Sequence, residues 1–208
     1  MRNETALNIA RAPAEIGRWE DLRIEPVART TGTNAPTFEK WFDDAGGTSR
    51  GVYLYSFDDA ATGSQKEVFF TMQMPHAALL GAPIRMHVHW VGAATVANAT
   101  PIWGLEYTWK SIGQVYADTV IVYTTGGNID GSGTPDTGVT AGKHYLSAFG
   151  DISPGTTADG LSSILIGRLF RFSGDASDTY TDKAGVTYID CHYIVDSLGS
   201  FSEYGKRT

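Results

Sequence analysis

Two short stretches with alternating side chains, residues 84–91 and 102–110, most constrain what this chain of 208 residues can fold into. In the first stretch Met86, Val88 and Trp90 alternate with His87 and His89. In the second, large apolar residues again occupy every other position: Trp103, Leu105, Tyr107 and Trp109. Because successive side chains of a β-strand point to opposite sides, each stretch predicts a strand with one buried, aromatic-rich face. We expect this pair to form the centre of the core.

Other segments of similar character follow one another along the chain, with Gly-, Ser- and Asp-rich turns between them. Together they predict about nine strands, at 37–42, 51–57, 67–74, 84–91, 102–110, 118–124, 143–149, 162–172 and 185–195. This pattern favours an all-β fold, an antiparallel β-sandwich that is jelly-roll-like, with an immunoglobulin-like sandwich as the second choice. The Gly-rich segment 125–142 is expected to be a loop too polar and flexible to pack a core.

The first 36 residues differ from the rest. Their spacing is weakly helical over residues 6–23 but is interrupted by Pro13 and Gly17, and a Thr/Gly/Asn/Pro segment follows. We therefore expect an N-terminal extended arm, residues 1–36, and a single sandwich domain, residues 37–208. The arm carries apolar residues that need a surface to cover, in its own domain or in a neighbouring subunit, which makes them candidates for attachment or subunit exchange: Ile16, Trp19, Leu22 and Ile24.

Composition excludes several classes of function. Sixteen basic and 23 acidic residues give a net charge of −7, and no basic cluster is present, which argues against nucleic acid as a partner. No apolar stretch is long enough to cross a membrane, and the N-terminus lacks the apolar segment of a signal peptide. Cys191 is the one cysteine, so no intrachain disulfide can form, and its apolar surroundings predict a buried thiol.

His87 and His89 are the sharpest chemical feature. Alternation places both rings on one face of a strand, about 6.6–7 Å apart. Metal-dependent cupins use such a pair inside a jelly roll, and the spacing from Gly81 to the pair matches their pattern. The acid that should follow shortly after the second histidine is absent, because Ala93 and Ala94 stand there.

A third metal ligand could come from Glu106, His144, Asp190 or His192. The alternative is that the pair contacts polar groups of neighbouring strands, such as Glu106 or Asp190. We predict this structural role, with no catalytic residue, no cofactor and no bound metal. A cupin-like, metal-dependent enzyme using His87 and His89, with Glu106 and His192 as further candidates, is the alternative.

Three further sequence patterns give weaker evidence of a functional site. The string Gly-Thr-Ser-Arg-Gly at 47–51 matches a nucleophile elbow, but a glycine turn precedes Ser49 and a strand follows it, so the match is taken as accidental. Residues 128–133 resemble the start of a calcium loop, but Val139 stands where the bidentate acid is needed. The many aromatic residues allow glycan stacking, although alternation places most of them on core faces.

Four stretches together resemble a group of virion proteins of tailed bacteriophages: Met74-Pro75-His76, His87-Val88-His89-Trp90, 103–109 (WGLEYTW) and 192–200 (HYIVDSLGS) with Glu203-Tyr204. The resemblance implies a non-enzymatic structural component of the particle, a β-sandwich made in the host cytoplasm and resident in the virion. Capsid decoration or a head fibre is the first expectation. A neck or tail part, or a protein that contacts a glycan or receptor through residues 125–142, is the alternative. The implied partners are further copies of itself, preferably in a trimer, and other virion proteins such as the major capsid or neck proteins.

Overall fold

The computed structural model describes residues 17–27, 35–47, 50–60, 64–125, 127–196, 199–200 and 202–203. Within these ranges the chain forms strands and no helix, and so nothing in them could cross a bilayer as an apolar helix. The strands are β1 (Arg18–Ile24), β2 (Thr37–Asp43), β3 (Gly51–Phe57), β4 (Glu67–Gln73), β5 (Ile84–Gly92), β6 (Val96–Ala97), β7 (Trp103–Lys110), β8 (Val120–Tyr123), β9 (Asn128–Ile129), β10 (Pro135–Asp136), β11 (Gly138–Val139), β12 (His144–Ile152), β13 (Ile164–Arg171) and β14 (Ala184–Val195).

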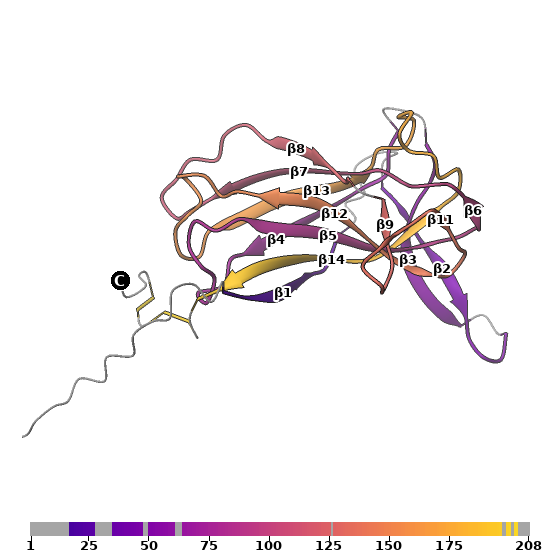
Figure 1. Ribbon diagram of the computed structural model, residues 1–208, viewed down its shortest axis with the longest axis horizontal. Coiled ribbons are helices and arrows are strands. Elements are labelled where there is room, and N and C mark those ends of the chain that lie inside the picture. The colour runs from indigo at the N-terminus through magenta and orange to yellow at the C-terminus, as the bar shows by residue number, and fades with distance from the viewer. Residues whose placement is uncertain are drawn as a thin grey trace, which may run out of the picture.

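Two antiparallel sheets face each other and form a β-sandwich (Figure 1). Sheet A has the order β10-β9-β12-β5-β14-β3-β2, with β1 also paired to β14, and sheet B has the order β4-β13-β7-β8. Along the chain, the main strands alternate between the two sheets: β3, β5, β12 and β14 belong to sheet A, and β4, β7 and β13 to sheet B. The exception is β8, which follows β7 within sheet B. This alternation, with β3-β14-β5-β12 facing β4-β13-β7-β8, is the strand order of a jelly roll, which confirms the predicted fold class.

The core lies between the sheets and is centred on the predicted pair of strands. Trp90 of β5 and Trp103 of β7 are fully buried with ring centroids 6.2 Å apart, and Phe57 meets Trp103 edge-on at 5.2 Å. The indole nitrogen of Trp90 donates to Ser147 Oγ at 3.0 Å, so its polar atom is satisfied inside the core. Cys191 is buried in the same core, opposite Met86, as its sequence context predicts, and burial raises the pKa of its thiol.

All nine predicted strands are present, with boundaries shifted by a few residues. Residues 18–23 form β1 instead of the weak helix suggested by their spacing, because β14 offers them a free edge along Ile189–Val195. The segment 125–142 was wrongly expected to stay off the core. It contains β9, β10 and β11, and it buries Asn128 and Val139 fully or nearly so.

The polar turn after β13 is held by a buried ion pair that the sequence did not indicate. Arg171 and Asp178 are both fully buried, and the guanidinium donates to the two carboxylate oxygens at 2.8 and 2.9 Å. Its three remaining donors reach the carbonyl oxygens of Phe57, Tyr180 and Asp182. A guanidinium with every donor used can stay charged inside a protein, and here it ties the loop 172–183 to the sandwich.

We predict that Arg171→Met destabilises the fold by about 3–5 kcal/mol, because it leaves the carboxylate of Asp178 buried and unpaired. Urea unfolding followed by tryptophan fluorescence measures the effect. The matched control is Lys183→Met, which breaks the more exposed ion pair with Glu39 and should cost less than about 1 kcal/mol. Equal losses in the two variants would contradict the importance given to the buried pair.

Candidate functional site

Four of the five histidines gather with one buried aspartate on the outer face of sheet A, away from sheet B. We call this group the histidine cluster; it consists of His87, His89, His144, Asp190 and His192. His87 and His89 alternate with the core residues of β5, and Asp190 lies directly opposite His87 on β14. All but His192 and His144 are buried.

An irregularity in β14 puts Asp190 on this face. Val186 pairs with Trp90 on the core side, but Tyr188 pairs with His89 on the outer side, so the register shifts at Thr187. The hydroxyl of Thr187 donates to the carbonyl oxygen of His89 at 2.9 Å, which holds the bulge in place. Without the extra residue, Asp190 would share the core face with Val186.

Asp190 is the centre of the cluster. Its Oδ1 lies 3.1 Å from His87 Nδ1, and its Oδ2 lies 3.1 Å from His192 Nε2. His89 Nε2 also approaches Oδ2, at 3.3 Å, outside hydrogen-bond geometry. Burial acts to raise the pKa of Asp190, but the hydrogen bond from His87 and the contact with His89 outweigh it and hold the pKa well below its usual range. The carboxylate is therefore ionised and is surrounded by ring nitrogens.

The contact between His89 and His144 fixes which nitrogens carry protons. His89 Nδ1 and His144 Nε2 are 2.8 Å apart, so one of them donates to the other. If His89 donated from Nδ1, its bare Nε2 would face the carboxylate of Asp190. The favourable arrangement places the proton of His89 on Nε2 and lets His144 donate. Partial burial lowers the pKa of His144, and so does the charge of His89 whenever that ring is protonated.

The cluster is covered on one side and open on the other. Tyr188 stacks on His89 with ring centroids 4.2 Å apart, and the guanidinium of Arg23 lies 4.9 Å from the centre of the Tyr188 ring. On the other side the side chain of His192 is 30% exposed, and Asp21 of β1, 68% exposed, places Oδ1 3.0 Å from His192 Nε2. A small ion could reach the cluster from this side.

The structure thus brings together three of the residues singled out from the sequence, His87, His89 and His192, and separates the fourth. Glu106 lies on β7 in sheet B, where it accepts hydrogen bonds from Thr119 and Arg168, and these lower its pKa. Asp190 and His144, named as possible partners, belong to the cluster. Asp21 was missed because β1 had not been recognised as a strand.

The cluster is not arranged as in a cupin. Such an enzyme needs its histidines inside the jelly roll, whereas here Met86, Val88 and Trp90 fill the interior side of β5. His87 and His89 face outward, so the interpretation as cupin-like chemistry is wrong in its geometry.

The calcium-loop pattern also fails in the structure. The side-chain amide of Asn128 points inward and donates to the carbonyl oxygen of Ala99 at 3.1 Å. Asp130 accepts two hydrogen bonds from Ser132, and the ammonium of Lys143 lies between Asp130 and Asp136, at 3.1 and 2.7 Å. A lysine therefore occupies the position that a cation would need. Ser49 of the elbow-like string lies outside the described residues.

The four arm residues proposed for attachment divide into different environments. Ile24 is buried in the core of its own domain, and Leu22 packs against that core. Trp19 remains 42% exposed, with the guanidinium of Arg85 4.9 Å from its ring. Ile16 lies outside the described residues. Of the three that are described, Trp19 has the largest free surface.

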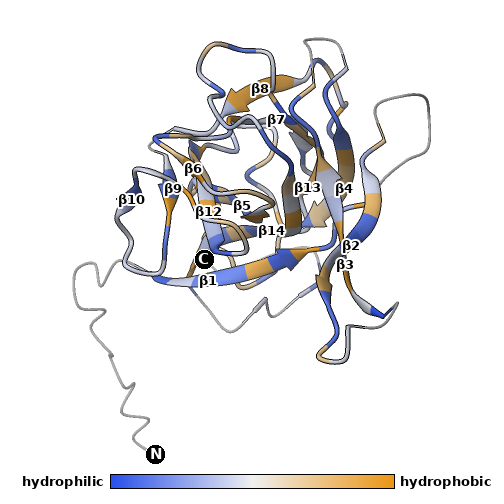
Figure 2. Ribbon diagram, turned by 90° about the vertical axis from the view of Figure 1, so that its right-hand side faces the viewer, coloured by the Kyte–Doolittle hydropathy of each residue, from blue (hydrophilic) through white to orange (hydrophobic). Residues whose placement is uncertain are grey.

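The β2–β3 hairpin extends away from the sandwich (Figures 1 and 2). It carries exposed aromatic side chains. Phe38 is 61% exposed and contacts the rings of Tyr53 and Tyr55, at centroid distances of 5.7 and 5.1 Å. Near the tip, Phe42 and Val52 are also exposed, but they pair with each other on the opposite side of the hairpin. We call Phe38, Tyr53 and Tyr55, whose rings are in contact on one side, the hairpin face. The alternating pattern predicted that most aromatic residues lie in the core. That prediction is wrong for this hairpin, because it extends beyond the part of sheet A that sheet B covers.

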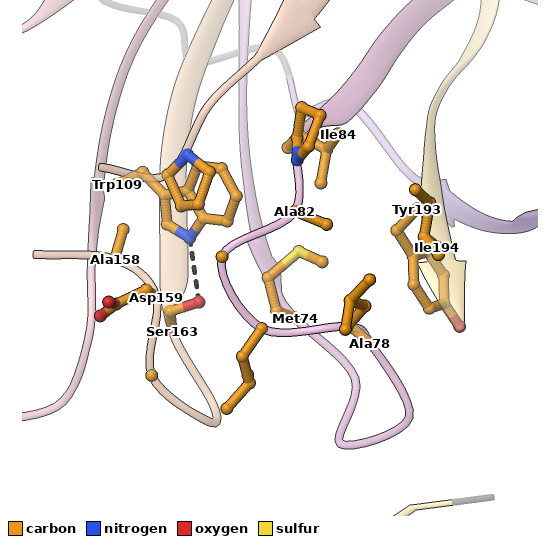
Figure 3. A pocket seen from close by; sticks show the side chains of 16 residues that line it. Met74, Ala78, Ala82, Ile84, Trp109, Ala158, Asp159, Ser163, Tyr193 and Ile194 are labelled. Atoms are coloured by element: carbon orange, nitrogen blue, oxygen red, sulfur yellow. Dashed lines mark hydrogen bonds between the residues drawn. The ribbon is translucent and has the colours of Figure 1, made fainter. Parts of the chain in front are cut away.

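A shallow apolar pocket lies at one end of the sandwich, with an empty volume of about 300 Å³ that includes open solvent (Figure 3). Met74, Trp109 and Tyr193 line it, together with the turn 78–83 and the segment 154–163. The indole nitrogen of Trp109 already donates to Ser163 Oγ at 3.0 Å. The pocket therefore offers packing surface more than chemistry.

No family model and no curated protein matches the sequence. Among solved structures, the chain is similar to one described as the structure of infectious bursal disease virus, Gx strain, with a TM-score of 0.40 and 12% identity. The match covers 87% of this chain and 34% of the other, so the chain spans about a third of that protein's length. A likeness of this size carries no conclusion about function.

We predict that Asp190→Asn, which keeps the shape of the side chain, lowers the free energy of unfolding near pH 7 by about 1.5–3 kcal/mol, the usual worth of hydrogen bonds to a charged group. Because folding lowers the pKa of Asp190, its ionisation stabilises the protein above the ordinary aspartate pKa of about 3.9, and this contribution is lost as the pH falls. Urea unfolding at about pH 7 and about pH 3 should show the difference between variant and wild type shrinking in acid. A difference that stays constant would show that the charge is not what matters.

Proposed function

We propose that this protein is a non-enzymatic structural component of a virus particle, and more specifically a capsid-decorating or head-fibre-like protein of a tailed bacteriophage. The sequence resemblance supplies the class, and its stretches at 87–90 and 103–109 lie in β5 and β7, while that at 192–200 begins in β14. The fold supports the proposal only in so far as jelly rolls suit such proteins, since they also occur in lectins and enzymes.

The observation that carries a binding role is the hairpin face. Its exposed rings form a continuous apolar surface on an element that leaves the body of the domain, and such surfaces mark interaction sites. The histidine cluster, in contrast, uses its polar atoms within the chain. An exposed apolar element, together with a cluster whose polar atoms mostly contact one another, favours an assembly protein over an enzyme.

We propose that the hairpin face and the N-terminal arm contact other copies of the chain, in a trimer by preference, or neighbouring virion proteins such as the major capsid or neck proteins. Closed symmetric oligomers are the commonest solution for such subunits. Neck or tail association is the alternative within this class. Contact with a glycan or receptor is a second candidate, favoured by the exposed rings of Phe38 and Tyr53, which could stack on sugars.

The location can be tested by counting copies of the protein in purified particles by quantitative mass spectrometry. A number that matches the capsid subunits indicates shell decoration, and one that matches a single ring at the vertex indicates the neck or tail. Absence from the particle would overturn the proposal.

For the hairpin face, we expect the double substitution Phe38→Ser with Tyr53→Ser to reduce the molar mass of the oligomer measured by light scattering, since it removes the centre of the apolar surface. The matched control is Val115→Ser, which changes an 82% exposed apolar residue elsewhere. A wild-type protein that is a monomer and does not bind particles would contradict the assembly role; specific signals on a glycan array would then favour the second candidate.

For the arm, two deletions separate attachment from folding. Removal of residues 1–16 leaves β1 in place, so it should weaken assembly without changing the unfolding midpoint. Removal of residues 1–36 also uncovers the edge of β14 and exposes the neighbours of Ile24, so it should lower the midpoint as well. If the shorter deletion leaves assembly unchanged, the arm has no part in attachment.

A further inference from the structure

Three residues of the histidine cluster place their ligand atoms close enough to bind one ion. The ligand atoms of His87, Asp190 and His192 all lie within 4.8 Å of one another. The two nitrogen–oxygen separations are both 3.1 Å. Around a tetrahedral Zn²⁺ with bonds of about 2.0–2.2 Å, neighbouring ligand atoms are about 3.3–3.6 Å apart. A small outward adjustment of the side chains is enough to admit the ion.

An unpartnered nitrogen points to the same place. The side chain of His89 is nine-tenths buried, and its Nε2 has no hydrogen-bond partner among the described residues although it lies 3.3 Å from Asp190 Oδ2. Buried polar atoms are seldom left unsatisfied, and an unseen water or ion is one explanation for those that are. A metal beside Asp190 would bind this nitrogen in place of its proton.

We propose that the histidine cluster is a binding site for one divalent transition-metal ion, with Zn²⁺ as the first choice, held by His87, Asp190 and His192 and completed by His89. Imidazole and carboxylate ligands suit Zn²⁺, Co²⁺, Ni²⁺ and Cu²⁺, whereas Mg²⁺ and Ca²⁺ prefer oxygen alone. The exposed side of His192 and the carboxylate of Asp21 give the ion a way in.

The surrounding residues already provide the outer support that metal sites need. When Nε2 of His89 binds the ion it releases its proton, and the proton between the two rings passes from His144 Nε2 to His89 Nδ1, which then donates across the same 2.8 Å contact. The ring of His144 takes up a proton on Nδ1 and stays neutral. Tyr188 fixes the plane of the His89 ring by stacking. Because the ligands come from β5 and β14, and Asp21 adds β1, the ion would join three strands of sheet A and stabilise the pairing of β1 with β14.

The test uses the full-length protein stripped of metal with EDTA. Calorimetric titration with Zn²⁺ should give one site per chain, and Co²⁺ should produce the visible absorption of a tetrahedral complex with nitrogen and oxygen ligands. Saturating Zn²⁺ should raise the melting temperature, since the ion binds the folded chain only. Each of His87→Gln and His192→Gln should weaken binding at least about tenfold, the size of effect seen even for outer-shell partners.

His76→Gln is the matched control, because it alters the histidine outside the cluster, which contacts Ser162 and Ser200 instead. It should bind Zn²⁺ as the wild type does. Circular dichroism checks that each variant is folded. If a histidine variant is unfolded, Asp190→Asn, which keeps the shape of the site, replaces it in the binding measurement. Absence of saturable binding, or equal affinity in the cluster variants and the control, would overturn the proposal. The outcome is independent of whether the protein is found in virus particles.

Discussion

The pairing of β5 with β14 at the centre of sheet A is the constraint on which the rest of the structure depends. Most side chains of these strands are buried on both faces, Arg85 and the partly buried residues of β14 excepted, so most of them must be accommodated without water. The inner face does this with Met86, Trp90 and Ile189 against sheet B. The outer face has no third layer of strands, so polar side chains there must satisfy one another, and a buried carboxylate needs several donors to remain charged. The histidine cluster is the solution adopted on that face.

Alternation alone predicted the nine main strands and the fold class, because period-two burial is a local property and the sandwich buries one face of each strand. It failed where burial depends on a partner distant in sequence. Residues 18–24 carry no strong alternation, and they become a strand because β14 has a free edge beside them. The buried pair of Arg171 and Asp178 likewise resembles an ordinary polar turn in the sequence, since nothing local shows that both side chains turn inward.

The site was predicted in part for the same reason. The spacing of His87 and His89 predicted that both rings lie on one face of a strand, and the structure confirms this. The position of Asp190 beside them depends on the register shift at Thr187, which no sequence pattern announces. Strict alternation through β14 would have put Asp190 on the core face with Val186, so the sequence offered Asp190 as one of several partners for His87 without selecting it. The exposed hairpin face was not predicted either. Alternating aromatic residues normally indicate a buried strand face, and here that face is exposed.

The two features that alternation did not settle have opposite physical characters, and this difference bears on how the protein works. The hairpin face is apolar, exposed and projecting, so its free energy is lowered by covering it, which requires another molecule. The histidine cluster is charged and mostly buried, and its described contacts lie within the chain, between β5, β12, β14 and β1. A protein in which contact with partners and internal cross-linking are carried by separate elements can hold its shape while it is bound. That division is the physical basis on which we propose that the protein is a subunit of an assembly.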